Sequence, residues 1–170
     1  RNADAASRDA AVAFGLAAIA EQETIISTKE TVAEQDKAER AFLERQIGLL
    51  EQKRDITKEI AEQRIRAIEA DKAELAAAEK SGDPSKLGAV RSRFGASRDE
   101  TSELDAEIAA VRESLSQQNA KMLDQLRAMN ETLKTAETVM VMEERELSRH
   151  REAIGRIERR LRGDYGYTGS

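Results

Sequence analysis

The sequence has no cysteine and no tryptophan, and it has a single proline, Pro84, and a single histidine, His150. Without cysteine the chain has no disulfide framework and no thiolate chemistry. Aromatic residues make up only 3% of the 170 residues, whereas charged residues make up 36%. Because the large side chains that fill a wide core are scarce, this composition argues against a thick globular domain.

The scarcity of proline permits very long helices. Proline has no amide proton and clashes with the preceding helical turn, so helix interiors exclude it. Alanine, glutamate, arginine and leucine, which favour helix, are abundant in this chain. Disorder is the rival interpretation of so polar a chain, but disordered segments lack regularly spaced apolar residues. A regular spacing of apolar residues would therefore favour an all-α protein over a disordered chain, and the two halves of the sequence both show one.

A seven-residue repeat runs through the first half of the chain. Eight of its ten positions are apolar, so one side of a long helix is expected to face a partner helix. Flanking residues, among them Leu50, Ile56 and Ile60, are expected to widen this apolar stripe. The ten positions are Val12, Ile19, Ile26, Ala33, Arg40, Ile47, Arg54, Ala61, Ile68 and Leu75.

The second half of the chain shows alternating steps of four and three residues. The first run comprises Leu104, Ile108, Val111, Leu115, Gln118 and Met122. The second run comprises Leu126, Met129, Leu133, Ala136, Met140, Glu143, Leu147, His150, Ile154, Ile157 and Leu161. Between Met122 and Leu126 the phase jumps by four residues, which locally unwinds a supercoil but leaves the helix continuous.

The strongest break signal lies between the two halves. Gly82 can end the incoming helix in a left-handed conformation, Asp83 can cap the next helix, and Pro84 suits its first position. Further along, Ser97 and Glu100 have the spacing of a capping box. The sequence thus predicts a sharp turn between two helices, with a weak spot at 88–97.

These signals predict a long antiparallel two-helix coiled-coil hairpin. The expected parts are a first helix at 4–80, a turn at 81–84, a second helix at 85–162 and a flexible tail at 163–170. Short connections place consecutive helices side by side. In such a hairpin the numbers of facing residues would sum to about 164, which places Arg40 near Asp124. The wide first stripe would leave apolar surface exposed, so we expect protein partners and a homo-oligomer or larger bundle.

No catalytic, metal or cofactor motif is recognisable. His150 lacks the partner residues that a metal site or a catalytic site needs, and it reads as a polar residue in the seam. The glycines at 82, 88 and 95 do not have the pattern of a phosphate loop. Acidic pairs such as Glu143 and Glu144 read as solvated helix faces. We therefore expect no enzyme activity, no cofactor and no bound metal.

Charge and hydropathy exclude further classes. The formal net charge of -5 argues against specific nucleic-acid binding, which needs a concentrated positive surface. The longest weakly polar stretch, 10–20, is too short to cross a bilayer, so no transmembrane segment and no secretory signal are expected. The opening at Arg1 without an initiator methionine suggests a piece of a longer protein.

Two basic regions are candidate interaction sites. The stretch 145–162 holds seven arginines against three glutamates and includes Arg156, Arg159, Arg160 and Arg162. We expect it to contact an acidic partner, such as the stretch 21–39 of a second copy. Alternatively, these arginines only complement the negative end of the helix dipole.

The second candidate region is the corner. It carries Lys86, Arg91 and Arg93 beside Phe94, and Leu87 and Val90 lie close by in the sequence. A basic, partly apolar tip is a plausible docking point for a partner. Chance clustering of these residues at a solvated turn is the alternative interpretation.

The runs at 43–54, 70–84 and 103–112 resemble the helical central part of tape measure proteins of long-tailed bacteriophages. That resemblance implies an extended helical protein inside a tail tube, whose length sets tail length. The outline is also similar to the coiled-coil hairpin of bacterial periplasmic adaptor proteins, but those hairpins are flanked by β-domains. We expect a structural scaffold or spacer, located in a virion or in bacterial cytoplasm. A secretion or membrane-assembly hairpin and a regulatory partner-binding coiled coil are the alternatives.

Overall fold

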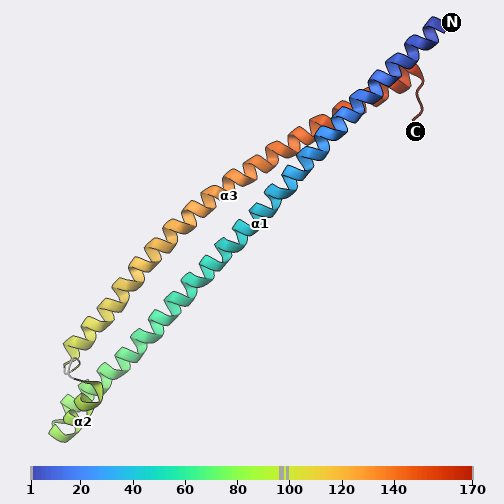
Figure 1. Ribbon diagram of the computed structural model, residues 1–170. Helices are drawn as coiled ribbons and strands as arrows, with labels where there is room; N and C mark the ends of the chain where they lie inside the picture. Colours follow the sequence, from blue (N-terminus) through green and yellow to red (C-terminus); the bar gives the residue numbers. More distant parts are fainter. Residues whose placement is uncertain (1, 96–97, 99, 170) are drawn as a thin grey trace. The chain divides into compact units, whose positions relative to one another are not determined.

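The computed structural model describes residues 2–95, 98 and 100–169, and all elements that it describes are helices (Figure 1). Helix α1 spans Asn2–Ser81, the short helix α2 spans Pro84–Phe94, and helix α3 spans Thr101–Tyr165. The two long helices pack antiparallel and α2 connects them, which forms a helical hairpin. The predicted fold class is therefore confirmed.

The turn after α1 has the chemistry that its sequence predicts. Gly82 adopts a left-handed conformation with φ 68°, where a side chain would be strained. Asp83 is extended and caps α2, because its Oδ1 accepts a hydrogen bond of 2.9 Å from the amide of Ser85. Pro84 takes the first helical position, where a missing amide proton costs nothing.

The second long helix differs from the prediction. The segment expected as one helix at 85–162 is divided: α2 ends at Phe94, within the expected weak spot at 88–97, and α3 begins at Thr101. Gly95 ends α2 with φ 87°, and its amide donates to the carbonyl of Arg91. At the start of α3 the amide of Glu100 donates to Oε2 of Glu103, one half of a capping box. The capping residue expected there, Ser97, lies outside the described residues.

The chain divides into two compact units. The corner unit comprises residues 45–130, and its core lies where all three helices meet. Leu75 of α1 and Leu104 of α3 are fully buried beside Ile68 and Ile108. The partly buried residues that pack against this cluster are Ile65, Leu87, Val90, Phe94 and Val111.

The terminal unit comprises Arg1–Glu44 and Glu131–Ser170 and contains one seam between α1 and α3. The predicted seven-residue repeat of α1 is half-buried there, from Val12 to Arg40. On α3 every predicted seam position from Leu133 to Leu161 is buried or half-buried. The alternating spacing of three and four residues therefore defined this seam correctly.

In the corner unit the seam departs from the prediction at two residues. Arg54 and Gln118 are both exposed, and Asn119 takes the seam position that was assigned to Gln118. Two consecutive four-residue steps therefore lead from Val111 through Leu115 to Asn119. The prediction placed these two steps between Gln118 and Leu126, by way of Met122. Gln118 instead donates a hydrogen bond to Ser114 on the surface of its own helix.

The pairing of the two helices is also shifted. In the terminal unit Arg40 contacts Glu137, and in the corner unit Lys72 contacts Asp105, so facing numbers sum to 177 in both pairs. The predicted sum of about 164 and the proximity of Arg40 to Asp124 were therefore wrong. The reason is the corner, which occupies residues 82–100 and includes α2, whereas the prediction allowed it only four residues.

The expected flexible tail is partly helical. Helix α3 continues through Gly163 to Tyr165, and Gly166 ends it with φ 61° and a hydrogen bond to the carbonyl of Arg162. The guanidinium Nε of Arg8 donates to the carbonyl of Tyr165 at 2.8 Å. This bond attaches the end of α3 to the first turns of α1.

Candidate functional site

The four arginines singled out at the end of α3 face solvent in the terminal unit. Arg160 lies 3.6 Å from Asp164, and Arg162 lies 3.5 Å from Glu158, one turn away on the same helix. Arg156 and Arg159 are also exposed. Exposed pairs of this kind contribute little to stability because solvent screens them. These four arginines therefore remain available to a partner.

Part of the basic stretch is neutralised within the chain itself. Arg151 donates to Glu30 at 2.9 Å across the seam. A second pair, Lys29 with Glu146 at 2.7 Å, joins a cation of the acidic stretch to an acid of the basic stretch and neutralises no arginine. From the sequence, the acidic stretch 21–39 was expected to reach the basic stretch from a second copy. For Arg151 this expectation was wrong, because the shifted pairing brings Glu30 of the same chain opposite it. Contact of Arg156, Arg159, Arg160 and Arg162 with an acidic partner stays a prediction.

The four corner residues singled out from the sequence lie in different environments. Lys86 is exposed and Arg91 is half-buried. Arg93 bonds Glu74, and its guanidinium lies 5.3 Å from the ring centre of Phe94. Phe94 packs with Leu87 and Val90 against the core cluster of the corner unit. The apolar residues expected to be exposed at the tip are thus half-buried.

Arg98 was counted from the sequence among the basic residues of the corner, but its partners were not predicted. Its guanidinium lies 3.0 Å from Asp71 of α1 and 2.6 Å from Glu107 of α3, and 5.4 Å from the Phe94 ring. The Arg98 side chain is only 20% exposed, so these contacts are partly shielded from water. No sequence signal links Arg98 to Asp71, because 27 positions separate them and only the fold brings them together.

The terminal unit has an unusual polar seam. Arg40 bonds Glu137 at 3.2 Å, and Nδ1 of His150 lies 2.6 Å from Oε1 of Gln22. His150 thus has a polar partner across the seam, which fits the interpretation of a seam residue.

Glu143, also predicted as a polar seam residue, shares a hydrogen bond with Asp36. That bond, together with desolvation and the Asp36 charge, raises the pKa of Glu143 from 4.5 to about 7. Oε2 of Glu143 is buried without a donor among the described residues. A proton shared between Glu143 and Asp36 would account both for the raised pKa of Glu143 and for its unpartnered Oε2. In contrast, the hydrogen bond from Lys29 lowers the pKa of Glu146, one turn further along α3.

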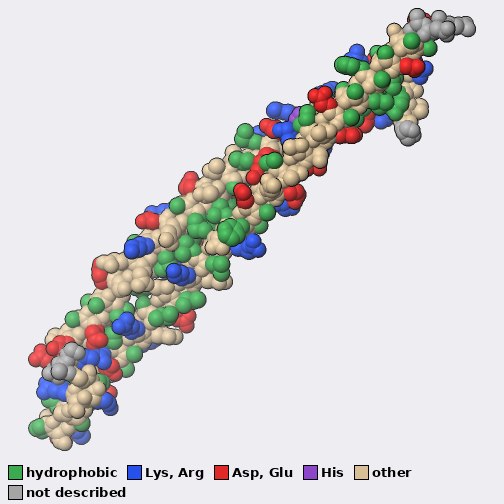
Figure 2. Space-filling model, viewed as in Figure 1, with side chains coloured by type: hydrophobic (Ala, Val, Ile, Leu, Met, Phe, Trp, Pro, Cys, Tyr) green, Lys and Arg blue, Asp and Glu red, His purple; other side chains and the backbone are tan. Residues whose placement is uncertain are grey.

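Large apolar side chains are exposed on both long helices. In the terminal unit Phe14 is 80% exposed, and Phe42 and Met142 are more than half exposed. In the corner unit Leu49, Ile56 and Ile60 of α1 are 57%, 56% and 59% exposed. Figure 2 shows hydrophobic side chains on the surface, interspersed with charged ones. Sequence analysis assigned Ile56 and Ile60 to the seam flank, whereas both face solvent.

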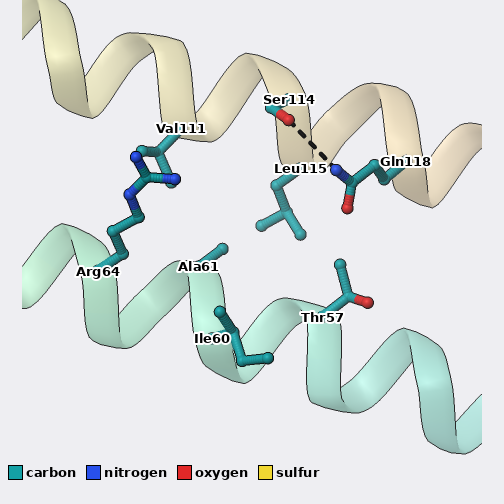
Figure 3. A pocket seen from close by; sticks show the side chains of 8 residues that line it. All are labelled: Thr57, Ile60, Ala61, Arg64, Val111, Ser114, Leu115 and Gln118. Carbon is teal, nitrogen blue, oxygen red and sulfur yellow. Dashed lines mark hydrogen bonds between the residues drawn. The ribbon is translucent and has the colours of Figure 1, made fainter.

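A groove opens beside this surface in the corner unit (Figure 3). Its volume is about 260 Å³, and its apolar lining comes from Ile60 and Ala61 of α1 and Val111 and Leu115 of α3. Thr57, Arg64, Ser114 and Gln118 supply the polar lining, and a hydrogen bond joins the last two. A groove that combines apolar walls with a polar rim suits a protruding side chain of a partner.

The described residues hold no metal-binding cluster, whereas helix α1 contains a strongly apolar window. Within residues 2–95, 98 and 100–169 no group of three or more histidines or carboxylates could hold a metal ion. Near its N-terminus α1 contains an 18-residue window of mean hydropathy 1.3, which is long and apolar enough to cross a membrane. The sequence-based expectation of no transmembrane segment rested on the charge-free stretch 10–20 alone. The longer window can include up to two charged residues. The core helix of a soluble protein and a signal sequence satisfy the same criteria.

The chain matches no protein-family model, no curated protein and no solved structure. The functional argument therefore depends on the surfaces described above.

Proposed function

We propose that this chain is a non-enzymatic coiled-coil scaffold or spacer that binds protein partners along its long helices. One observation carries the proposal: large apolar side chains are exposed on both α1 and α3, in the corner unit and in the terminal unit. Contiguous exposed apolar surface in a water-soluble protein marks a binding surface. A chain whose helices are held together by a narrow seam is suited to setting a distance or presenting such surfaces.

The form of scaffold that we propose is a segment of a phage tape measure protein. The heptad runs at 43–54, 70–84 and 103–112 support this form through their resemblance to that family. The length of the parent gene and the identity of the neighbouring genes test which form of scaffold is correct. A very long reading frame beside tail genes supports this one, and an attached sensory or catalytic domain supports a regulatory coiled coil.

A hairpin of a secretion or membrane-assembly adaptor is the second candidate. The observation that favours it is the apolar 18-residue window of α1. Flanking β-domains in the parent protein would support this candidate over the first.

The spacer role predicts a change in dimension when helix length changes. Removing one heptad from α1 together with the facing heptad of α3 keeps the seam in phase and shortens each helix by about 10 Å. In the parent protein this deletion should shorten the assembled structure, as measured by electron microscopy. A variant in which the same two heptads are replaced by other helical heptads is the length control. Unchanged dimensions of the deletion assembly, with the hairpin still folded, would refute the spacer role.

A further inference from the structure

Three large aliphatic side chains form a row on α1 in the corner unit. Leu49, Ile56 and Ile60 are spaced by seven and four residues, so they lie on one side of the helix. This side differs from the seam, where Ile47 and Ala61 are buried. We call these three residues the α1 row.

Two opposite charges lie beside the α1 row at equal distances from Gln52. Arg45 lies seven residues before Gln52, and Glu59 lies seven residues after it. A separation of two turns puts all three residues on the same side of the helix, next to the row. Both charged side chains are exposed, and neither has an ion-pair partner among the described residues.

We propose that the α1 row binds the same row of a second copy, antiparallel, across a two-fold axis near Gln52. This inference rests on the proposed scaffold function and names its partner as a second copy of the chain. Residues equidistant from the axis face each other, so Arg45 of each copy lies opposite Glu59 of the other. Leu49 then lies beside Ile56 of the second copy, and the symmetry repeats each contact.

The charges select this orientation over the parallel one. A parallel arrangement in register would set Arg45 beside Arg45 and Glu59 beside Glu59, and like charges at such positions repel. The antiparallel arrangement replaces both repulsions with attractions. Ile60, which forms part of the wall of the groove in Figure 3, lies eight residues from the axis, at the edge of the contact, where the second copy presents residues near Glu44.

Lys53 opposes association, because it lies one residue from the axis and therefore close to its own symmetry mate. Its aliphatic stem can pack along the row while the ammonium group reaches water. A polar residue in such a position lowers affinity and fixes the alignment of the two helices. Replacing Lys53 by leucine should therefore tighten the dimer.

A charge-swap series tests the pairing. Sedimentation of the chain is measured from about 1 µM to about 1 mM, at low and high salt, for the wild type, Arg45→Glu, Glu59→Arg and the double variant. Each single variant creates two like-charge contacts and should weaken dimerisation at low salt at least about tenfold. The double variant restores opposite charges and should return to within about threefold of the wild type.

A disulfide test locates the axis independently. Since the chain has no cysteine, Gln52→Cys introduces one thiol, which should form a disulfide with its own mate on mild oxidation. The matched control is Glu51→Cys, an exposed neighbour that points about 100° away from Gln52 around the helix. Circular dichroism of each variant verifies that the helices remain intact.

Three results would overturn the proposal: a wild type that stays monomeric over the whole concentration range, a double variant that fails to recover, or equal cross-linking of the two cysteine variants. None of these bears on the dimensions measured for the heptad deletion. Loss of the dimer with an unchanged length effect removes only this inference. Intact dimerisation without a length effect removes the spacer role instead.

Discussion

Glu143 of α3 lies across the seam of the terminal unit from Asp36 of α1, and its interaction with Asp36, together with desolvation, raises the pKa of Glu143 to about 7. A carboxyl group whose pKa is higher in the folded state binds more protons there than in the unfolded chain. The contribution of Glu143 to folding stability therefore decreases as the pH rises from about 4.5 to about 7 and does not change further above that range.

Replacing Glu143 by glutamine should remove this pH dependence. The amide of glutamine donates a hydrogen bond to Asp36 at every pH, so the variant should be more stable than the wild type at pH 8. Urea unfolding in a pH series from about 4.5 to 8 measures the effect. Glu144→Gln, at the exposed neighbouring position, is the control and should retain the wild-type profile. Parallel profiles for Glu143→Gln and the wild type would contradict the shared proton.

Two glycines of α1 should respond differently to alanine. In an open helix interior, alanine is more stable than glycine by about 1 kcal/mol. Gly48 has nothing within 4 Å of an added Cβ, so Gly48→Ala should raise the unfolding free energy by about that amount. At Gly15 an added Cβ would lie 2.7 Å from Cδ2 of the buried Leu161, so the clash should cancel this gain. Thermal unfolding of both variants measures the difference, and an equal gain at both sites would argue against the close helix approach at Gly15.

The core of the corner unit should depend on its two fully buried leucines. Leu75→Ala and Leu104→Ala should each reduce the unfolding free energy by about 2 to 5 kcal/mol, because each leaves a cavity. Leu123, which is 38% exposed on α3, provides the matched control, and Leu123→Ala should cost below about 1 kcal/mol. Equilibrium unfolding in urea distinguishes the two classes. Similar losses at all three positions would show that the core is not centred where the three helices meet.

Arg98 should be the most sensitive cation of the corner. Arg98→Lys keeps the charge but loses the planar group that reaches Asp71 and Glu107 together and lies over the Phe94 ring. We expect a loss of about 1 to 2 kcal/mol in the unfolding free energy. The same exchange at Arg127, which is 72% exposed and 4.0 Å from Asp124, should have no measurable effect. Equal sensitivity at both positions would contradict a bridging role for Arg98.

The local features of the fold could be predicted from the sequence. Gly82, Asp83 and Pro84 determine the turn through their own backbone preferences, so no distant residue is needed to recognise it. The seam of the terminal unit follows from the three- and four-residue spacing that ends at Leu161. Both predictions depend on neighbours along the chain, which the sequence shows directly.

The pairing of the helices could not be predicted, because it depends on α2. The sequence at 85–94 reads as helix whether it continues into α3 or forms a separate helix. Burial of Leu87, Val90 and Phe94 against the cluster of Leu75 and Leu104 decides between these outcomes, and it involves residues far apart in the sequence. The shift from 164 to 177 in the facing numbers follows from this choice, and so does the contact of Arg151 with Glu30.

The candidate site was only partly predictable for the same reason. The basic residues from Arg156 to Arg162 were found from charge counts, and their exposure agrees with a solvated helix face. Ile56 and Ile60 were noticed as apolar but were assigned to the seam. Leu49 lies seven residues before Ile56, and Ile60 lies four residues after it, outside the main repeat. This spacing was the signal that the three residues form a separate row.

The corner also determines how copies of this protein can meet. Its apolar side chains, Leu87, Val90 and Phe94, are turned toward the core, while Lys86 and Arg93 remain at the surface. Two copies that approached each other corner to corner would find little apolar surface to bury. End-to-end contact through the corners is therefore disfavoured. A growing assembly must then join copies along the flanks of their helices, where aliphatic side chains are exposed.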